Sequence, residues 1–301
     1  MKEIVLITGA NGNLAQDVGR HLEKDYIIRY LTTDKNSISK KSYFFWDLEK
    51  NYIDNNALKD CKHIVHLAGH SILKRWTKKN KQKIYDSRIK AAELIFIKCK
   101  NMNINIKTFI SASATGIYDY RIQDRIIESS NKGNDWVSKM ACDWENSAEI
   151  FSELGARVVK LRIPLIFSKN SGFLKYNLIS MKYGLGIIIG NRQRNISWMH
   201  INDISRFVKE SISNDNYNGP YNLASDDVIS QERLFNLIRE KLFPYSIVIR
   251  IPTFFIRLLL GKRTQIINSD IFLETKKLKE HGFKCKFNSF EELMRIIKTD
   301  S

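Results

Sequence analysis

The sequence is poor in cysteine and proline, and these shortages narrow its class. Only 4 of its 301 residues are cysteines and only 4 are prolines. The cysteines lie far apart and form no C-x-x-C pair, which argues against a zinc site and against a disulfide framework. Reduced cytoplasmic thiols are the simplest interpretation. The chain also has no repeat, no low-complexity linker and no proline-rich hinge.

A long hydrophobic run is also absent. The most apolar late stretch, 247–260, contains a proline and two arginines and is too short for a membrane-spanning helix. We expect a helix of the core or of a lobe there, with a peripheral membrane contact as the lesser alternative. The run Ile4–Ile7 is too short for the apolar region of a signal peptide. We therefore expect a cytoplasmic protein with no membrane partner.

Acidic residues are in the minority. The chain has 49 lysines and arginines against 32 aspartates and glutamates, a net charge of +17. Such an excess suits a protein that binds nucleic acid or anionic substrates. However, the lysines are spread along the chain, and there is no basic tail and no zinc-finger or RNP pattern. We attribute the excess of positive charge to compositional drift and expect no nucleic-acid partner.

Apolar runs alternate with amphipathic stretches over the first half of the chain. Strands are expected at 4–8, 27–32, 42–46, 63–67, 107–111 and 158–163, and helices near 13–23, 78–99 and 137–154. This alternation predicts an α/β fold with a Rossmann-like doubly wound parallel sheet. We expect a dinucleotide-binding domain over 1–165, to which 196–225 returns, and a smaller C-terminal substrate lobe over 166–195 and 226–301.

The first expected strand leads directly into a glycine turn. Ile4–Ile7 is an unbroken apolar run, and Gly9 and Gly12 precede a helix that is expected to begin near Asn13. The amide groups at the start of such a helix can bind a pyrophosphate. Gly9 can adopt the strained backbone angles of the turn, and Gly12 lets phosphates approach closely. The alternative is an ordinary strand–helix turn of an α/β protein.

Further motifs agree in one resemblance. They are Asp47-Leu48, His66-Leu67-Ala68-Gly69, Lys74-Arg75-Trp76-Thr77, Ser87-Arg88, Ser111-Ala112-Ser113-Ala114-Thr115-Gly116, Asp143-Trp144-Glu145 and Trp198-Met199-His200-Ile201-Asn202-Asp203. With the glycine turn, they make the chain similar to the extended short-chain dehydrogenase/reductase family. The Arg-Trp-Thr and Asp-Trp-Glu pieces and the C-terminal lobe resemble its atypical epimerase-family branch, named after sugar-nucleotide epimerases. The resemblance covers nearly the whole chain.

The resemblance implies the residues of a nicotinamide dinucleotide site. Gly9, Gly12 and Ala15 are expected to bracket the pyrophosphate, and the further cofactor-binding residues expected in this segment are Thr8, Asn11, Asn13 and Leu14. Asp47 and Leu48 would meet the adenine. The ribose and nicotinamide would lie against small and apolar residues, namely Leu67, Ala68 and Gly69. The other interpretation of Asp47 is a helix N-cap or turn aspartate.

The choice between NADP and NAD depends on the end of the second expected strand. An acidic residue there favours the ribose diol of NAD, and a basic residue favours the 2′-phosphate of NADP. The resemblance implies NADP, although Thr33 stands where the branch usually carries an arginine. Lys35 could reach the phosphate instead, and Thr32 and Thr33 could donate hydrogen bonds to it. An inward-pointing Asp34 would favour NAD instead.

The catalytic residues of the wider family are only partly present. The family uses a serine, a tyrosine, and a lysine four residues after the tyrosine. Ser113 stands at the serine position, but Trp136 and Met140 occupy the positions of the tyrosine and the lysine. Tyr118 and Lys139 are the candidates to replace them. Packing or loop anchoring is the alternative role for Tyr118.

Arginines supply the candidate contacts to an anionic substrate, because a guanidinium matches phosphate and carboxylate geometry. The expected substrate residues are Arg75, Arg88 and Thr115. Alternatively, Arg75 and Arg88 belong to a solvated or ion-paired helix face and do not contact a substrate. The other candidate arginines are Arg162, Arg192 and Arg194. No metal is expected, because three histidines lack the spacing of a metal site: His63, His66 and His70.

These features predict an NAD(P)-dependent epimerase/dehydratase-like oxidoreductase that acts on a small molecule. The alternative is an NADP(H)-binding sensor or scaffold protein, weakened as a catalyst by loss of the Tyr-x-x-x-Lys pair. The expected partners are the small-molecule substrate and a second copy of the chain in a homodimer.

Overall fold

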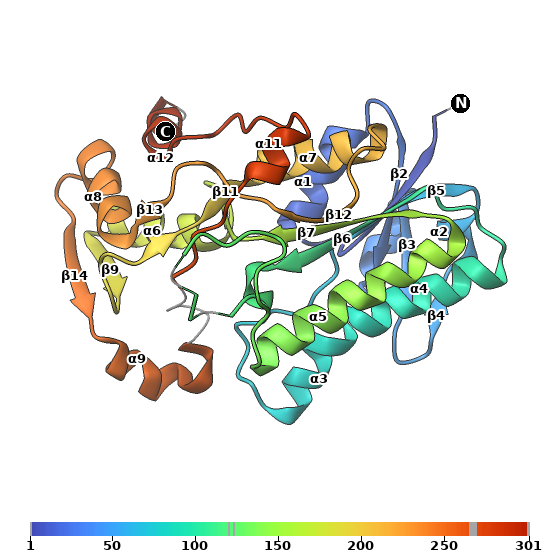
Figure 1. Cartoon of the computed structure of the whole chain (residues 1–301), viewed down its shortest axis with the longest axis horizontal. Helices are drawn as coiled ribbons and strands as arrows, with labels where there is room; N and C mark the ends of the chain where they lie inside the picture. Colours follow the sequence, from blue (N-terminus) through green and yellow to red (C-terminus); the bar gives the residue numbers. More distant parts are fainter. Residues whose placement is uncertain (1, 120, 123, 265–269, 300–301) are drawn as a thin grey trace. The chain divides into compact units, whose positions relative to one another are not determined.

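The apolar runs of the first half of the chain become strands of one large sheet (Figure 1). The computed structural model of the protein describes residues 2–299 except 120, 123 and 265–269. The strands of this sheet are β1 (Ile4–Thr8), β2 (Ile27–Thr32), β3 (Tyr43–Asp47), β4 (Tyr52–Ile53), β5 (Cys61–His66), β6 (Thr108–Ala114), β7 (Arg157–Ile163) and β12 (Gly219–Asn222). Their order across the sheet is β12-β7-β6-β5-β1-β2-β3-β4.

The sheet is mostly parallel. Each neighbouring pair from β6 through β5, β1 and β2 to β3 is parallel, whereas β4 is antiparallel to β3. The expected Rossmann-like α/β fold is thereby confirmed. β1 and β2 have the expected bounds, because central parallel strands are buried on both faces and read as continuous apolar runs. The bounds of β3, β5, β6 and β7 lie within three residues of expectation.

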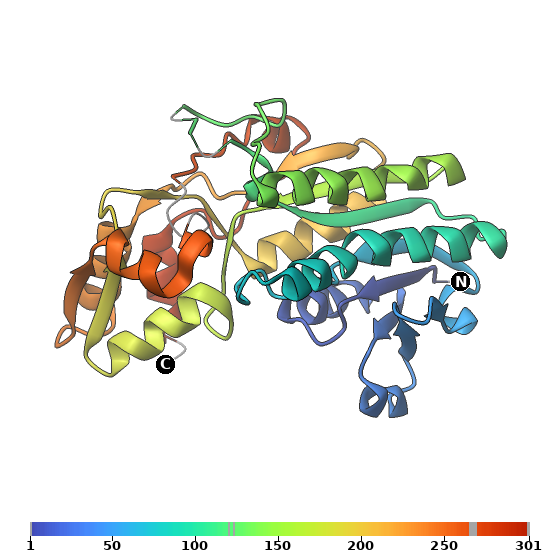
Figure 2. The same ribbon diagram turned by 90° about the horizontal axis from the view of Figure 1, so that it is seen from below.

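Helices cover both faces of this sheet. Helices α4 (Ile89–Asn101) and α5 (Trp136–Glu149) run side by side on one face (Figure 2). On the other face, α1 (Asn13–Leu22) lies with α7 (Ile201–Ser213), and Ser205 of α7 donates a hydrogen bond to Asp17 of α1 at 2.7 Å. The remaining helices and turns of this region are α2 (Asn55–Leu58), α3 (Lys78–Asp86), η1 (Lys35–Ser39), η2 (Thr115–Ile117) and η3 (Ile150–Leu154).

The stretch 78–99 forms two helices where one was expected. α3 ends at Asp86 and α4 begins at Ile89, although no glycine or proline lies between them. The Ser87 hydroxyl accepts a hydrogen bond from the His70 amide at 2.8 Å, and the Arg88 guanidinium donates to the His70 carbonyl at 2.9 Å. The single-helix prediction is wrong because these tertiary contacts override the local pattern.

The strand order reverses between β1 and β5. From β1 the chain builds outward through β2 and β3, and it then adds β5 and β6 on the other side of β1. In such sheets, ligands bind outside the carboxyl ends of the strands at the reversal. Gly9 follows the end of β1, and Leu67, Ala68 and Gly69 follow the end of β5. The topology therefore predicts a ligand site at these residues.

The chain divides into two compact units. The first comprises Met1–Ile117, Asn134–Arg162 and Ile204–Tyr221, and the second comprises Tyr118–Gly133, Ile163–Asp203 and Asn222–Ser301. These bounds differ from the expected domain bounds mainly at 118–133, and the domain assignment stays a prediction. The elements of the second unit are β8 (Leu165–Phe167), α6 (Gly172–Lys182), β9 (Leu185–Ile189), β10 (Asn195–Ile196), β11 (Trp198–His200), β13 (Ile229–Ser230), α8 (Gln231–Lys241), β14 (Ile247–Ile251), α9 (Thr253–Leu260), η4 (Gly261–Arg263), α11 (Lys276–Glu280) and α12 (Phe290–Thr299).

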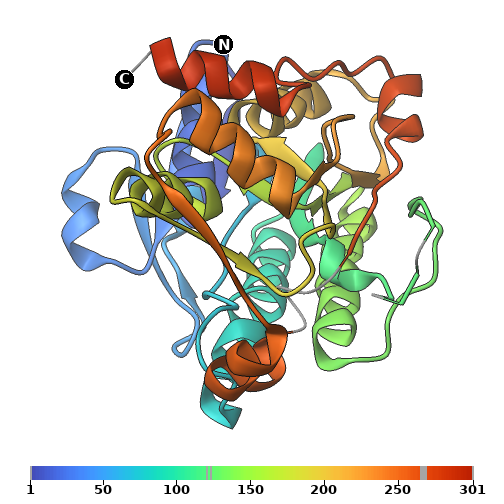
Figure 3. The same ribbon diagram turned by 90° about the vertical axis from the view of Figure 1, so that its left-hand side faces the viewer.

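Buried aromatic side chains form the core of the second unit. The rings of Phe167 and Trp198 stack with their centroids 5.0 Å apart, and α8 and α12 lie side by side against the same core (Figure 3). Asp203 is fully buried and accepts hydrogen bonds from the backbone amides of Lys286 (2.8 Å) and Phe287 (2.9 Å). The aspartate of the Trp198–Asp203 motif therefore anchors the C-terminal segment.

The apolar stretch 247–260 is split between two elements. Ile247–Ile251 is the strand β14, paired in parallel with β9, and α9 begins after Pro252. No helix within the described residues has both the length and the apolar character that crossing a membrane requires.

Candidate functional site

The glycine turn after β1 presents backbone amides at the start of α1. Gly9 has a φ of +77°, and a Cβ atom there would lie 2.9 Å from the Leu67 carbonyl oxygen. The Gly12 amide donates to the Gly9 carbonyl at 2.8 Å, and α1 begins at the next residue, Asn13. No side chain within the described residues caps α1. Helix N-termini of this kind bind anions, because the first amides have no partner inside the helix.

A buried hydrogen-bond network holds the ends of β1 and β5 together. The Thr8 hydroxyl accepts from the amides of Leu67 and Ala68, both at 3.0 Å, and it donates to Nδ1 of His66 at 2.9 Å. Nε2 of His66 donates to the Arg88 carbonyl at 3.0 Å. Thr8 thus holds the backbone at the ends of β1 and β5 together. Neutral His66 links the Thr8 hydroxyl to the Arg88 carbonyl. Among the described residues, no group of histidines, cysteines and carboxylates could hold a metal ion.

This network makes the protein sensitive to acid. Burial lowers the pKa of His66 from 6.5 to about 4, since a charged imidazolium would lose its hydration there. The folded pKa lies below the unfolded one, so the stabilisation is complete above pH 6.5 and is lost as the pH falls towards 4. Over that interval we expect the free energy of unfolding to decrease by about 3 kcal/mol from this group alone.

Urea unfolding at pH 7 and at pH 5 measures this loss. A His66→Asn variant should be less stable than the wild type at pH 7, and the gap should narrow at pH 5. A gap of equal size at both pH values would show that His66 does not titrate with folding.

A cavity of about 880 Å³ lies over the glycine turn, inside the first unit. It extends past the carboxyl ends of β1, β2, β3 and β5, and residues of α3 and α4 close one side. Nine of the predicted cofactor residues line it: Gly9, Asn11, Gly12, Thr33, Asp47, Leu48, Leu67, Ala68 and Gly69. The structure thus brings together residues from four separate segments of the chain. A cavity of this volume can hold a dinucleotide-sized ligand.

The remaining predicted cofactor residues surround the cavity. Thr8 lies beneath it, and Asn13 and Leu14 form the first turn of α1. Lys35 is exposed in η1, and its Nζ lies 5.5 Å from the ring centroid of Phe45, which lines the cavity. The ammonium group of Lys35 is therefore close to the cavity wall.

The two aspartates that follow β2 and end β3, Asp34 and Asp47, have different surroundings. Asp47 lines the cavity, and its Oδ1 accepts from the amides of Glu49 (3.0 Å) and Lys50 (3.2 Å), as a turn aspartate does. Asp34 instead caps η1: its carboxylate accepts from the Ser37 hydroxyl and the Asn36 amide, which lower its pKa. Asp34 is not among the residues of the cavity wall.

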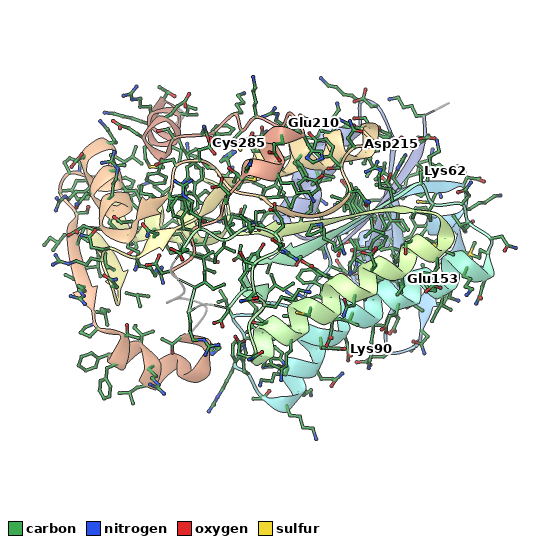
Figure 4. The ribbon with its side chains drawn as sticks, in the orientation of Figure 1. Lys62, Lys90, Glu153, Glu210, Asp215 and Cys285 are labelled. Atoms are coloured by element: carbon green, nitrogen blue, oxygen red, sulfur yellow. The ribbon has the colours of Figure 1, made fainter. Side chains whose placement is uncertain are left out.

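Charged side chains at the break between α3 and α4 also line the cavity, and sequence reasoning did not single them out as site residues. They are Lys83, Asp86 and Lys90, and the last two form an ion pair at 2.9 Å (Lys90 is labelled in Figure 4). Lys83 and Ser87 are four residues apart, a spacing that places them on one side of a helical turn. That spacing in the sequence could have identified Lys83 and Ser87 as residues on the same side of the cavity.

Arg88, a predicted substrate residue, holds backbone rather than facing solvent. Its Nη1 donates to the carbonyls of His70 (2.9 Å) and Ile84 (3.0 Å), and its guanidinium lies 4.9 Å from the ring centroid of Trp144. A Cβ on Gly69 would lie 2.9 Å from this guanidinium, so the glycine is needed for the close approach. Burial lowers the pKa of Arg88 to about 10.

Ser113, at the end of β6, belongs to a buried ionic network. Its hydroxyl donates to Oε1 of Glu145 at 2.8 Å, and Arg162 holds the same carboxylate through Nε (2.8 Å) and Nη2 (2.9 Å). Burial alone raises the pKa of Glu145, but the hydrogen bonds and charge of Arg162 outweigh it, and the net pKa lies below its ordinary value. Glu145 is therefore ionised and can only accept, so the single proton of Ser113 points at it.

Four further residues are predicted to act in catalysis or to contact the substrate, and each has its own surroundings. Tyr118 is 2% exposed in the second unit, and its hydroxyl donates to Oδ1 of Asn222 at 2.5 Å. Lys139 is exposed on α5 in the first unit. Thr115 begins η2, and Arg75 is exposed before α3.

A tryptophan, Trp136, stands at the position where the resemblance implies a tyrosine. Trp136, at the start of α5, packs edge-on against Trp76 with ring centroids 5.0 Å apart, and Nζ of Lys81 lies 4.7 Å from the Trp136 centroid. Met140, at the lysine position, is buried. Neither side chain can take up or release a proton.

Comparison with known proteins gives one consistent family. The model of the NAD dependent epimerase/dehydratase family matches residues 5–224. A curated epimerase family protein from Staphylococcus aureus is 29% identical over 290 residues, which cover 95% of this chain and 96% of the relative. One from Staphylococcus haemolyticus is 29% identical over 297 residues, or 96% and 98% of the two chains.

Solved structures share the fold at lower sequence identity. A human epimerase family protein crystallised with NADPH has a TM-score of 0.88 and 17% identity, covering 99% of this chain and all 100% of its own. The UDP-N-acetylglucosamine 4-epimerase of Methanobrevibacter ruminantium, in complex with UDP-N-acetylmuramic acid, has a TM-score of 0.79 and 21% identity, with 99% and 98% coverage. At these identities the likeness concerns the fold.

Proposed function

The chain belongs to the NAD dependent epimerase/dehydratase family, and from that premise we propose that it is an oxidoreductase that uses NADP(H) on a small-molecule substrate. The observation that carries the proposal is the cavity of about 880 Å³ built over the glycine turn. Its position outside the ends of β1 and β5 is where this sheet topology binds dinucleotides. Among the solved neighbours, the human protein binds NADPH, which supports the same class of cofactor.

The residues of the cavity fit a dinucleotide. The amides at the start of α1 would receive the pyrophosphate, and a Cβ on Gly12 would enter the space at 3.1 Å from the Gly9 carbonyl oxygen. Asp47 and Leu48 would meet the adenine. Leu67, Ala68 and Gly69 would line the nicotinamide half. The positive charge of Lys83 would offset part of the charge of the phosphates, whereas Lys90 is paired with Asp86.

NADP is favoured over NAD by the end of β2. Thr33 lines the cavity, Lys35 is close to its wall, and Asp34 is engaged in capping η1. A carboxylate that bound the ribose diol would instead have to face the cavity. Lys35 and Thr33 are therefore the proposed contacts to the 2′-phosphate.

Replacing Lys35 tests the proposed cofactor. We expect Lys35→Ala to raise the Kd for NADPH about tenfold, the loss of one charge-assisted contact, and to leave the Kd for NADH unchanged. Lys40→Ala is the matched control, because Lys40 lies against Tyr43, outside the cavity wall. Titration of the wild type and of each variant with NADPH and with NADH gives the change in each Kd. An equal loss for NADPH and NADH would contradict a role in phosphate recognition.

When bound, NADP(H) supplies or accepts a hydride. Because the Ser113 proton is committed to Glu145, the lone pairs of its Oγ would accept a hydrogen bond from a substrate hydroxyl. Thr115, Arg75 and Arg88 remain the proposed substrate contacts. Tyr118 and Lys139 remain the proposed replacements for the missing tyrosine and lysine.

A dinucleotide sensor or scaffold is the second candidate. The packing of Trp136 against Trp76 and the burial of Met140 favour it, because these side chains take the places of the proton-transferring pair. Transfer of deuterium from 4-deuterated NADPH into a panel of small carbonyl compounds distinguishes the two. The oxidoreductase transfers label to at least one compound, whereas the sensor binds NADPH and transfers none. A cytoplasmic location and a homodimer stay predictions.

A further inference from the structure

The two-stranded sheet formed by β9 and β14 has apolar side chains on both of its faces. Alternate residues of a strand point to opposite faces, and Ile188 and Val248 point into the core of the second unit. The other face, called the β9–β14 face below, is aliphatic throughout: Leu185, Ile187, Ile189, Ile247, Ile249 and Ile251. Ile247 is 67% exposed. A sheet face in contact with water is normally polar, so this face requires a partner that covers it.

Helix α9 extends the exposed apolar surface beyond the end of β14. It begins directly after Pro252 (Figure 1), and Phe254, Phe255 and Leu258 are each more than half exposed. Phe254 and Leu258 are four residues apart and therefore share one side of the helix. Arg257 is the only charged residue of α9. Exposed phenylalanine and leucine side chains beside an arginine are typical of a helix that lies in a membrane interface.

Two exposed tyrosines border the β9–β14 face where its strands begin. Tyr183 is the residue after α6, and Tyr245 precedes β14. The Tyr245 hydroxyl donates to the Lys182 carbonyl at 2.8 Å, and the Ile247 amide donates to the Gly184 carbonyl at 2.8 Å. These bonds hold both tyrosines next to the β9–β14 face. A tyrosine has an apolar ring and a polar tip, so it suits the boundary between hydrocarbon and water.

The charged residues of this part of the chain have one sign. The segments 163–202 and 241–264, which contain α6, β9, β14 and α9, have ten lysines and arginines and no aspartate or glutamate, although the whole chain has 32 acidic residues. Lys182 and Arg257 are exposed next to the apolar side chains. The charges therefore favour an anionic partner. A second copy of the chain would bring the same positive charges against this surface.

We propose that the β9–β14 face, together with α9 and the end of α6, docks the protein on an anionic lipid bilayer. Phe254, Phe255 and Leu258 enter the boundary between headgroups and acyl chains, and Lys182 and Arg257 lie at the level of the lipid phosphates. The stretch 247–260 then makes the peripheral membrane contact that was the lesser alternative from the sequence. This inference goes beyond the proposed cofactor chemistry, because it concerns the second unit and needs no dinucleotide.

Cosedimentation with sucrose-loaded vesicles tests the docking. The wild type should bind vesicles of phosphatidylcholine and phosphatidylserine, and it should bind phosphatidylcholine alone about tenfold more weakly. The double variant Phe254→Ser/Phe255→Ser should lower the partition coefficient on the anionic vesicles about 100-fold, because each phenylalanine loses its transfer from water. Ile97→Ser is the matched control: Ile97 is half-exposed on α4 of the first unit, and its loss should not change vesicle binding.

The folding of these variants is checked by urea unfolding. Both should keep the wild-type midpoint, because the side chains that they replace are exposed. Tyr183→Ser tests the same surface from another element and should weaken binding to the anionic vesicles severalfold. A double variant that keeps its fold and binds these vesicles as the wild type does would overturn the proposal.

Arg257→Gln tests the contribution of charge. It should weaken binding to the anionic vesicles about fivefold and leave binding to phosphatidylcholine unchanged. Arg295→Gln is the control, because Arg295 lies on α12, on the other side of the second unit from α9 (Figure 3). A wild type that stays in the supernatant with both kinds of vesicle contradicts the proposal. So does a wild-type dimer in vesicle-free buffer that the double variant converts to a monomer, because the surface would then bind a second copy.

Discussion

Gly12→Val is expected to abolish dinucleotide binding and to leave the protein folded. Gly12 lines the cavity at the start of α1, so two added methyl groups would occupy the space proposed for the pyrophosphate. Its φ of −81° is accessible to any residue, and an added Cβ would meet only the Gly9 carbonyl oxygen, at 3.1 Å. We expect the Kd for NADPH to rise more than about 100-fold, equivalent to about 3 kcal/mol. The stability loss should be about 1 kcal/mol, that of a poorer N-cap.

Energy transfer from tryptophan to bound NADPH and urea unfolding measure the two effects separately. Gly186→Val is the control, because its added atoms would crowd Phe235 and Val248 in the second unit. It should lose stability and keep the wild-type Kd for NADPH. A Gly12→Val protein that still binds NADPH with wild-type affinity would remove the glycine turn from the site.

Glu145→Ala is expected to destabilise the first unit strongly. Glu145 and Arg162 are 5% and 3% exposed, and the substitution removes the carboxylate that accepts two hydrogen bonds from the guanidinium. Breaking a buried pair by removing one partner costs about 3–5 kcal/mol, because the other charge stays buried. The Ser113 hydroxyl also loses its acceptor. Urea unfolding at pH 7 measures the loss.

Glu149→Ala provides the comparison on the same helix, one turn later. Glu149 is exposed and pairs with Lys160 of β7, so its loss should cost less than about 1 kcal/mol. Equal losses in the free energy of unfolding for the two variants would mean that the buried Glu145–Arg162 pair contributes no more to stability than the Glu149–Lys160 pair. The pH dependence of stability gives a second test. Because folding lowers the pKa of Glu145, the ionised carboxylate stabilises the folded protein at pH values above the unfolded pKa. This stabilisation is lost as the pH falls through the folded pKa.

Local patterns were sufficient for β1, β2, β3, β5, β6 and β7 and for most of the cavity, whereas the short strands β4 and β12 were not predicted. The run Ile4–Thr8 is apolar throughout because both faces of β1 are covered, and such a run is visible without any structure. Gly9 and Gly12 are equally visible in the sequence, because the turn itself requires glycine at both positions. Gly9 has a positive φ, and a Cβ on Gly12 would lie close to the Gly9 carbonyl oxygen. Residues at strand ends, such as Asp47 and Ala68, follow once the strands are placed.

Contacts between distant segments could not be predicted in this way. The break between α3 and α4 depends on His70, which bonds Ser87 and Arg88 from 17 and 18 residues away. The Asp-Trp-Glu motif was recognised, but the partners of Glu145 come from β6 and β7. Among the arginines, the sequence favoured Arg75 and Arg88. Arg194 is 6% exposed, and neither its Nε nor its Nη1 has a hydrogen-bond partner among the described residues; the sequence around it does not predict this burial.

Direct titration of the wild-type protein with NADPH tests the central claim, that the cavity over the glycine turn holds a nicotinamide dinucleotide. Isothermal calorimetry should give a saturable curve with one site per chain, and NADH should bind more weakly. No binding heat with either cofactor at millimolar concentration, for a protein that unfolds cooperatively, would contradict the account.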